Sequence, residues 1–421
     1  MKPIIAGAMG HLLLWTAGLA LTCAASAEGV SVDAAMRRAL ERAPALRAHA
    51  DAGRAFAADA EAAGALPDLK LRLGLDNQPI EGADALSVRR DFMTMRRVGV
   101  SREMVRDEKR ELRAARARVD AEREEHAALE RRRAIRREVA QAYVEAVYAA
   151  RALESVAAIT GDVEVQVAAL VGRVRAGQAR PMDAVAAQVQ ARALEDRRAE
   201  IEMRHARARA VLARWSGLAA NQSLAGLTLE RAAADARALT GVPVEEHPRL
   251  AVAASAERAA ENELAQARAA SRGDWSWEVA YQSRGPAFTD MVSFGIAIDL
   301  PQWNAARIDP VVRARESARA AAQAARAEAL RAHALERELA ELEWDRTFRR
   351  QAAFDATLSP LARERAAQAL AAWRGGAGSL AEVLEARRQV LETALAHLDL
   401  QAAAARAWAQ LVYFMPEEQL P

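Results

Sequence analysis

Cysteine is almost absent from this chain. The 421 residues include a single cysteine, Cys23, which lies in the N-terminal apolar segment. Beyond that segment the chain can therefore form neither a disulfide nor a thiolate metal site. Seven histidines are present, and no two are three or four residues apart, so a helical pair of metal ligands is excluded. We predict no metal site and no cofactor.

Catalytic signatures are also absent from the sequence. It contains no P-loop, no nucleophile elbow and no dinucleotide-binding fingerprint. Gly375, Gly376 and Gly378 follow no strand pattern, so we interpret them as a turn between helices rather than as a phosphate loop. We predict no catalytic residues, and therefore that the protein is not an enzyme.

Long hydrophobic runs are confined to the N-terminus. Lys2 is followed by an apolar run through Leu12–Leu14 and then by Ala25-Ser26-Ala27, the pattern of a secretory signal peptide, residues 1–27, cut after Ala27. A retained anchor helix is the alternative. Lipid attachment at Cys23 is another, although Thr22 before it fits poorly. No later run of about twenty apolar residues follows, so we expect no membrane-spanning helix.

Charge of one sign is not in excess. The formal net charge is +2 although 28% of the residues are charged, and the two signs are interleaved. A nucleic-acid-binding protein would be expected to show a basic excess, so that class is disfavoured. Together with the signal peptide, this composition indicates an exported protein.

Four segments alternate between apolar and polar residues, which predicts strands at about 68–76, 95–102, 274–282 and 291–300. The turn residues between them predict two hairpins. The residues that we expect on the apolar, membrane-facing side include Leu71, Leu73, Trp275, Trp277, Phe294 and Ile296. Strands of this kind suit an outer-membrane β-barrel, although a half-buried hairpin of a soluble protein has the same pattern.

Four strands are too few to close a membrane barrel, because the smallest single-chain barrels have about eight. An open sheet edge in lipid would leave backbone groups without hydrogen-bond partners. If the hairpins span a membrane, several chains must therefore combine their strands. Three chains would supply twelve.

The chain also repeats its order of helix, hairpin, long helix and return helix. Pro44 corresponds to Pro248, and Gly177 corresponds to Gly376 (376 − 177 = 199). We therefore expect an internal duplication, with repeat 1 at 28–220, a linker at 221–243 and repeat 2 at 244–421. The long helices have narrow apolar stripes between charged residues, which is typical of coiled-coil-like pairs.

This organisation resembles the TolC-like outer-membrane factors over essentially the whole mature chain. The resemblance rests on three features. The first is the repeated order of elements, and the second is the pair of motifs before the long helices, Val98-Gly-Val-Ser101 and Ile298-Asp-Leu-Pro-Gln-Trp303. The third is the pair of turns at Arg175-Ala-Gly177 and Trp373-Arg-Gly-Gly376. The resemblance implies a mainly α fold with a small β part. It implies a homotrimer whose twelve-stranded barrel lies in the outer membrane of a Gram-negative cell and continues into a periplasmic α-helical barrel.

The family further implies a passive exit duct of a tripartite efflux system. Substrates would arrive from an inner-membrane pump of the RND or ABC type through a periplasmic adaptor protein. The compact hairpin loops are most similar to the heavy-metal efflux branch. A type I protein-secretion or drug-efflux duct is an alternative within the fold, and a periplasmic coiled-coil scaffold is an alternative outside it.

The resemblance also assigns residues at the two turns between long helices. Glu382 and Glu385, with Asp183 at the corresponding place in repeat 1, match acids that ring the periplasmic gate. Ordinary acids in the first turn of a helix would look the same. The tips that dock the adaptor correspond to Gly177, Gly376, Arg175 and Arg374, and plain helix C-caps are the alternative reading of the glycines. Arg180-Pro181 departs from the usual tip pattern.

Overall fold

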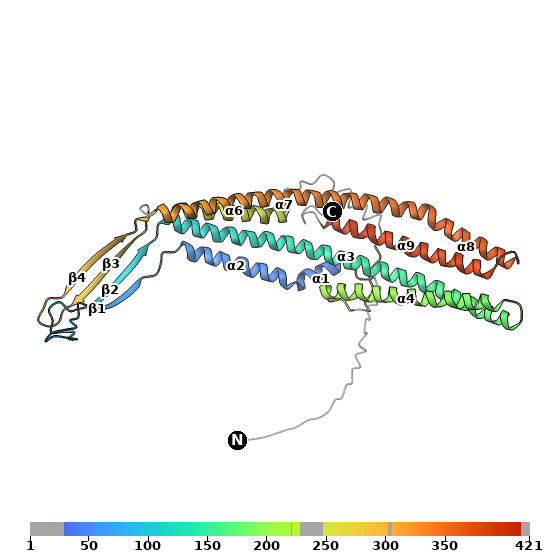
Figure 1. Ribbon diagram of the computed structural model, residues 1–421, viewed down its shortest axis with the longest axis horizontal. Coiled ribbons are helices and arrows are strands. Elements are labelled where there is room, and N and C mark those ends of the chain that lie inside the picture. Colours follow the sequence, from blue (N-terminus) through green and yellow to red (C-terminus); the bar gives the residue numbers. More distant parts are fainter. Residues whose placement is uncertain (1–28, 220, 228–246, 302–304, 414–421) are drawn as a thin grey trace, which may run out of the picture.

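The computed structural model describes residues 29–219, 221–227, 247–301 and 305–413. The chain is long and narrow, with a β-sheet at one end and, at the other end, the two turns that connect pairs of long helices (Figure 1). The helices are α1 (Val32–Arg42), α2 (Pro44–Gly64), α3 (Asp107–Arg175), α4 (Pro181–Ser216), α6 (Pro248–Ala269), α7 (Ala305–Ala353), the π-helical turn η3 (Phe354–Leu358), α8 (Ser359–Arg374) and α9 (Leu380–Val412). The strands are β1 (Lys70–Asp76), β2 (Met95–Met104), β3 (Trp275–Ser283) and β4 (Met291–Ile298). The mainly α fold with a small sheet is confirmed.

Helix boundaries follow local sequence signals. Ser31 caps α1 by accepting a hydrogen bond from the backbone N–H of Ala34. Pro44 ends that helix and occupies the first turn of α2, where its missing N–H costs nothing. The 69 residues of α3 contain no proline and form one helix, which at 1.5 Å per residue is about 100 Å long.

The four strands form one antiparallel sheet in the order β1-β2-β3-β4. The two predicted hairpins, β1–β2 and β3–β4, are present, and β2 pairs with β3 to join them. This central pairing brings residues about 180 positions apart into register, for example Gly99 opposite Ala280. The strand pattern alone did not specify it.

The core is a thin seam between helices rather than a broad interior. Its first part packs Ile135, Val139 and Tyr143 of α3 against α1, α4 and α9. Its second part lies toward the helical turns, where Val156 and Val163 of α3 meet residues of α4 and α9. Alanine fills much of the first part and lets the helices approach closely there, whereas leucine and valine dominate the second part.

Two features differ from expectation. The second long helix is interrupted at η3, directly before Ser359-Pro360, because a proline in a helix removes a hydrogen bond and clashes with the preceding turn.

Among the described residues, α3 is apolar enough over one 18-residue window to span a membrane by length and composition, whereas we expected no such helix. Only 24% of that window is buried, which is less than a core helix would show, and Val156, Val163 and Leu170 are among its buried residues.

Part of the predicted linker is described. Residues 221–227 lie against α3, and Leu224 forms a parallel bridge with Val30. The hydroxyl of Tyr143 lies 2.6 Å from the carbonyl oxygen of Val30 and 2.7 Å from that of Ala225. The signal peptide, Cys23 and residues 228–246 lie outside the described part of the chain.

Candidate functional site

One face of the sheet is apolar and uncovered. Straight across the four strands run two apolar rows, Leu71–Val100–Val279–Phe294 and Leu73–Val98–Tyr281–Val292. The side chains of Leu73, Phe294 and Ile296 are 73%, 80% and 72% exposed. Trp275 is exposed on the same face, whereas Trp277 is half-buried. Such a continuous exposed apolar surface marks a site of contact with lipid or protein.

The opposite face is polar and small. Arg72 donates to Glu278 at 3.0 Å, and Arg97 lies 3.2 Å from Asp76 and 3.7 Å from Glu278. Gly99 leaves little room for a side chain, because a Cβ there would lie 3.0 Å from that of Ala280. The sheet therefore has one face suited to an apolar medium and one suited to water.

Within the described part of the chain, both edges of this sheet are open. There, β1 pairs only with β2, and β4 pairs only with β3. Each edge presents a row of backbone N–H and C=O groups without a strand partner. An unpaired edge beside an exposed apolar face is a template for pairing with another chain.

Ion pairs fix the sheet to the helices. Asp274, buried at the start of β3, accepts from the backbone N–H of Arg106 at 3.0 Å and from the ammonium group of Lys109 at 2.8 Å. These two contacts, with the Lys109 charge, lower the pKa of Asp274 although burial opposes them. The orientation of the sheet relative to α3 is therefore set by charge as well as by the chain connection.

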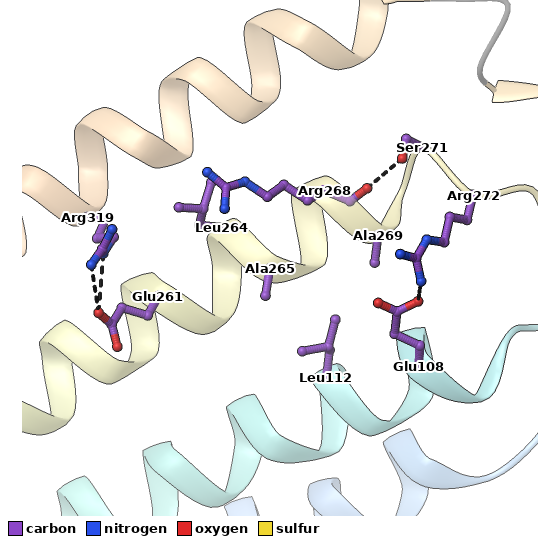
Figure 2. A pocket seen from close by; sticks show the side chains of 10 residues that line it. All are labelled: Glu108, Leu112, Glu261, Leu264, Ala265, Arg268, Ala269, Ser271, Arg272 and Arg319. Atoms are coloured by element: carbon purple, nitrogen blue, oxygen red, sulfur yellow. Dashed lines mark hydrogen bonds and ion pairs between the residues drawn. The ribbon is translucent and has the colours of Figure 1, made fainter.

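A pocket of about 590 Å³ lies beside this junction, between α3, α6 and α7 (Figure 2). Leu112, Leu264 and Ala265 line its apolar part. Its two carboxylates are occupied, since Glu261 pairs with Arg319 at 3.2 Å and Glu108 pairs with Arg272. We interpret the pocket as the space between ion-paired helices rather than as a reaction site.

The two turns between long helices have the same backbone structure. Gly177 and Gly376 have φ of +71° and +79°, a conformation that glycine adopts without strain. At the first turn, the N–H groups of Gly177 and Gln178 donate to the carbonyls of Val174 and Arg173, and the second turn repeats this pattern. Both are Schellman motifs. No atom beyond each glycine's chain neighbours lies within 4 Å of the place where its Cβ would be, so both turns are open to a partner.

The three predicted gate acids lie close to these turns, and each has a partner nearby in sequence, either the N-cap residue of its helix or a residue one turn further along it. Asp183 pairs with Arg180 at 3.0 Å. Glu382 forms a capping box with Ser379, in which each residue's backbone N–H donates to the other's side chain. Glu385 pairs with Arg388 at 2.5 Å, and that contact lowers the pKa of the Glu385 carboxyl.

Arg175 and Arg374, the predicted adaptor-docking residues, are exposed in the last turns of α3 and α8. The sequence did not predict how the two tips meet. The guanidinium of Arg173 lies 5.8 Å from the ring centroid of Trp373, which links the first tip to the second. A paired Arg and Trp on separate helices leave no local sequence signal.

A buried cluster near the middle of the chain was also missed. The rings of His247 and His333 are in contact, with centroids 4.0 Å apart and planes tilted by 52°, and Glu130 lies 3.7 Å from His247. Burial lowers the pKa of His333 and raises the pKa of Glu130. Within the described residues, no group of three or more acidic, histidine or cysteine side chains is placed to hold a metal ion.

Solved structures of outer-membrane channels have this fold. The outer membrane protein VceC from Vibrio cholerae superposes with a TM-score of 0.75 over 91% of this chain and 95% of its own, at 19% identity. CusC gives a TM-score of 0.76 over 92% of both chains at 17% identity. The open state of the MtrE outer membrane channel of Neisseria gonorrhoeae gives 0.70 over 91% and 88%, at 18% identity.

Comparisons of sequence alone are negative, since no protein-family profile and no curated protein match the chain. The chain therefore has the fold of these outer-membrane channels. The resemblance to the TolC-like outer-membrane factors is confirmed as a likeness of fold.

Proposed function

We propose that the protein is a TolC-like outer-membrane channel, the passive exit duct of a tripartite efflux system. The observation that carries the proposal is the four-stranded sheet, which combines an exposed apolar face, a polar face and two open edges. In lipid such edges must be paired, because each unsatisfied backbone group costs several kcal/mol. Three copies supply twelve strands, enough to close a barrel with its polar face toward the lumen.

The helical part supports the same assembly. Exposed apolar side chains lie on α4, at one edge of the helical layer, and on α7 and α8, at the other edge (Figure 1). They are Val185, Val189 and Met203 on α4, and Leu335, Leu339, Leu342 and Leu361 on α7 and α8. In a trimer these two edges face each other between neighbouring copies, which extends the barrel into the periplasm as a helical tunnel.

The tips provide the proposed contact with the periplasmic adaptor. Gly177 and Gly376 leave the backbone of each turn accessible, and Arg175 and Arg374 place a positive charge beside each. An inner-membrane RND or ABC pump, reached through the adaptor, would supply the energy.

For the cargo, heavy-metal cations are our preferred proposal, with drugs or secreted proteins as alternatives. We expected both hairpin loops to be compact, as in the heavy-metal efflux branch. Only the β3–β4 connection is short, whereas the β1–β2 connection spans 77–94, so only one of the two loops supports that branch.

Glu382, Glu385 and Asp183 are proposed to form the periplasmic gate. In a threefold assembly each carboxylate occurs three times at one level, and a ring of acids attracts cations and repels anions. The ion pair of Glu385 with Arg388 keeps the carboxylate ionised, because it lowers the pKa. The same pair also offsets part of the ring's charge, so the gate acts through a balance of Glu385 and Arg388.

Two adjacent substitutions on opposite faces of β4 test the channel proposal. Ile296→Arg puts a charge on the face assigned to lipid, which costs about 2–4 kcal/mol at the middle of a bilayer. Ala297→Arg puts the same charge on the face assigned to the lumen. We expect Ile296→Arg to abolish insertion of purified protein into liposomes and conductance in planar bilayers, while Ala297→Arg inserts and alters ion selectivity.

Equal insertion of both variants, or a wild-type protein that is monomeric and fully soluble without detergent, would contradict the channel. The second result would favour a periplasmic coiled-coil scaffold. That alternative requires the apolar sheet face to be covered, and in the described chain it is exposed.

A further inference from the structure

The two halves of the sheet correspond residue by residue. Val98-Gly99-Val100 aligns with Phe294-Gly295-Ile296, at an offset of 196 (294 − 98 = 196). Gly99 faces Arg72 in the first hairpin, and Gly295 faces Glu278 in the second. β1 therefore aligns with β3 at an offset of 206 (278 − 72 = 206). This alignment matches the apolar residues of β1 with those of β3 and the apolar residues of β2 with those of β4. The observed β2–β3 pairing therefore suggests how the open edges, β4 and β1, could pair.

We propose that β4 of one copy pairs with β1 of a second copy in the register that β2 and β3 adopt within the chain. Gly99 faces Ala280 within the chain. Their counterparts are Gly295 and Gly74, so these two glycines face each other across the junction between copies. The inference rests on the proposed function, since it specifies how the copies of the barrel meet.

The side chains that this register brings together are complementary. On the outer face, Ile296 faces Leu73 and Ile298 faces Leu71 of the second copy, and all four are exposed in the single chain. On the inner face, Asp299 faces Lys70 of the second copy, and opposite charges directly across a strand pair are stabilising. Within the described residues, no ion pair engages the side chain of either Asp299 or Lys70.

Neighbouring registers are less favourable. A slip by one residue would turn every apolar side chain of one strand toward the polar face of the other. A slip by two residues in one direction sets Asp299 opposite Asp68, a repulsive pair. A slip by two in the other direction sets it opposite Arg72, whose guanidinium already pairs with Glu278 at 3.0 Å.

The register also closes a barrel of ordinary geometry. A line straight across the ladder from Lys70 passes Ser101, Glu278 and Gly295, and reaches Gly74 of the next copy. That residue is four positions beyond the start (74 − 70 = 4), which is one residue per strand. With about 3.3 Å per residue and about 4.8 Å between strands, the strands tilt by about 35°. Barrel strands typically tilt by about 35–45°.

Disulfide trapping tests the register. The matched variants carry Ile296→Cys with Leu73→Cys on the outer face, or Gly295→Cys with Gly74→Cys on the inner face. The slipped variants carry Ile296→Cys with either Leu71→Cys or Leu75→Cys. Matched positions lie about 4.5–5.5 Å apart between Cβ atoms and slipped positions about 7–8 Å apart, and a disulfide needs about 3.5–4.5 Å. Single-cysteine variants control for Cys23.

After copper-phenanthroline oxidation of membranes, we expect the matched variants to form covalent dimers and trimers on non-reducing gels, with no larger species. The slipped variants should form several-fold less. Stronger linking of a slipped variant, or unlinked matched variants that still run as trimers in mild detergent, would overturn the register while leaving the channel intact. Monomers alone in detergent, without linking in any variant, would overturn both.

Discussion

Asp274 and Lys109, 165 positions apart, form an ion pair of 2.8 Å at the junction between the sheet and the long helices. Their side chains are only 12% and 13% exposed. Lys109 is the third residue of α3, and Asp274 directly precedes β3, so the pair joins the two halves of the chain. It fixes the base of the sheet where a barrel would meet a helical tunnel.

Asp274→Asn is expected to destabilise the protein by about 1–3 kcal/mol, because it leaves the Lys109 ammonium partly buried without its counter-ion. The asparagine oxygen can still accept from the backbone N–H of Arg106, so the change isolates the charge. Thermal unfolding in detergent measures the effect. Asp51→Asn, which breaks an exposed pair with Arg54, should change stability by less than about 0.5 kcal/mol. Equal effects from the two variants would contradict a structural role for the junction pair.

The left-handed glycines at the tips lead to a second prediction. Gly376→Ala and Gly177→Ala should each destabilise by about 1–2 kcal/mol, because alanine is strained at positive φ. Gly172→Ala is the matched control inside α3, where no outside atom would contact the new methyl group. It should stabilise by about 0.5–1 kcal/mol, since alanine favours a helix over glycine.

A bulky substitution at the same glycine probes adaptor docking. Gly376→Trp should abolish cross-linking to the adaptor while trimers persist. Retained cross-linking, with trimers intact, would contradict docking at this tip.

Local features were predictable because their causes are local. The alternation of Leu71 and Leu73 with charged residues defined a strand and its apolar face, and Ser31 defined the start of α1. The glycines at the tips indicated helix ends, which the Schellman hydrogen bonds show.

Contacts between distant segments could not be predicted from one sequence. The pairing of β2 with β3 depends on how helices bring the two hairpins together, and alternation alone fits many partners. The ring contact of His247 with His333 and the contact of Arg173 with Trp373 join separate segments whose side chains carry no periodic signal. Glu382 was compatible with either a gate acid or an acid of the first helical turn; the spacing of Ser379 and Glu382 is the sequence signal of a capping box, and the geometry shows that box.

The buried histidines predict a pH dependence of stability. Burial lowers the pKa of His333 from its ordinary 6.5, so the unfolded chain binds this proton more readily than the folded chain. The free energy of unfolding should therefore fall as the pH decreases through about 6.5 toward the lowered pKa. Glu130 opposes this at lower pH, because burial raises its pKa above 4.5. His247, Glu336, Arg133 and Arg249 also line the cluster.

Thermal unfolding between about pH 7.5 and pH 5.5 measures this dependence. His333→Gln should reduce the slope without abolishing it, because burial and Arg209 lower the pKa of His205 as well. His126→Gln, at a half-buried histidine of α3 outside this cluster, is the control for replacing a histidine with glutamine. An unchanged slope in His333→Gln would contradict the assignment.

Two substitutions of Glu382 distinguish its proposed gate role from its capping role. Glu382→Gln keeps a side chain that can complete the capping box, whereas Glu382→Ala removes it and should cost about 0.5–2 kcal/mol. Glu385→Gln leaves Arg388 with Glu392, 2.5 Å away, as its remaining acidic partner. If the acids form a ring at the pore mouth, the double variant Glu382→Gln/Glu385→Gln should shift the closed channel from cation toward anion selectivity and raise its conductance in planar bilayers. Glu364→Gln, an exposed change on α8 away from the turn, is the control for charge alone. Unchanged selectivity in the double variant, with trimers intact, would leave Glu382 as a capping residue and Glu385 as half of a local ion pair.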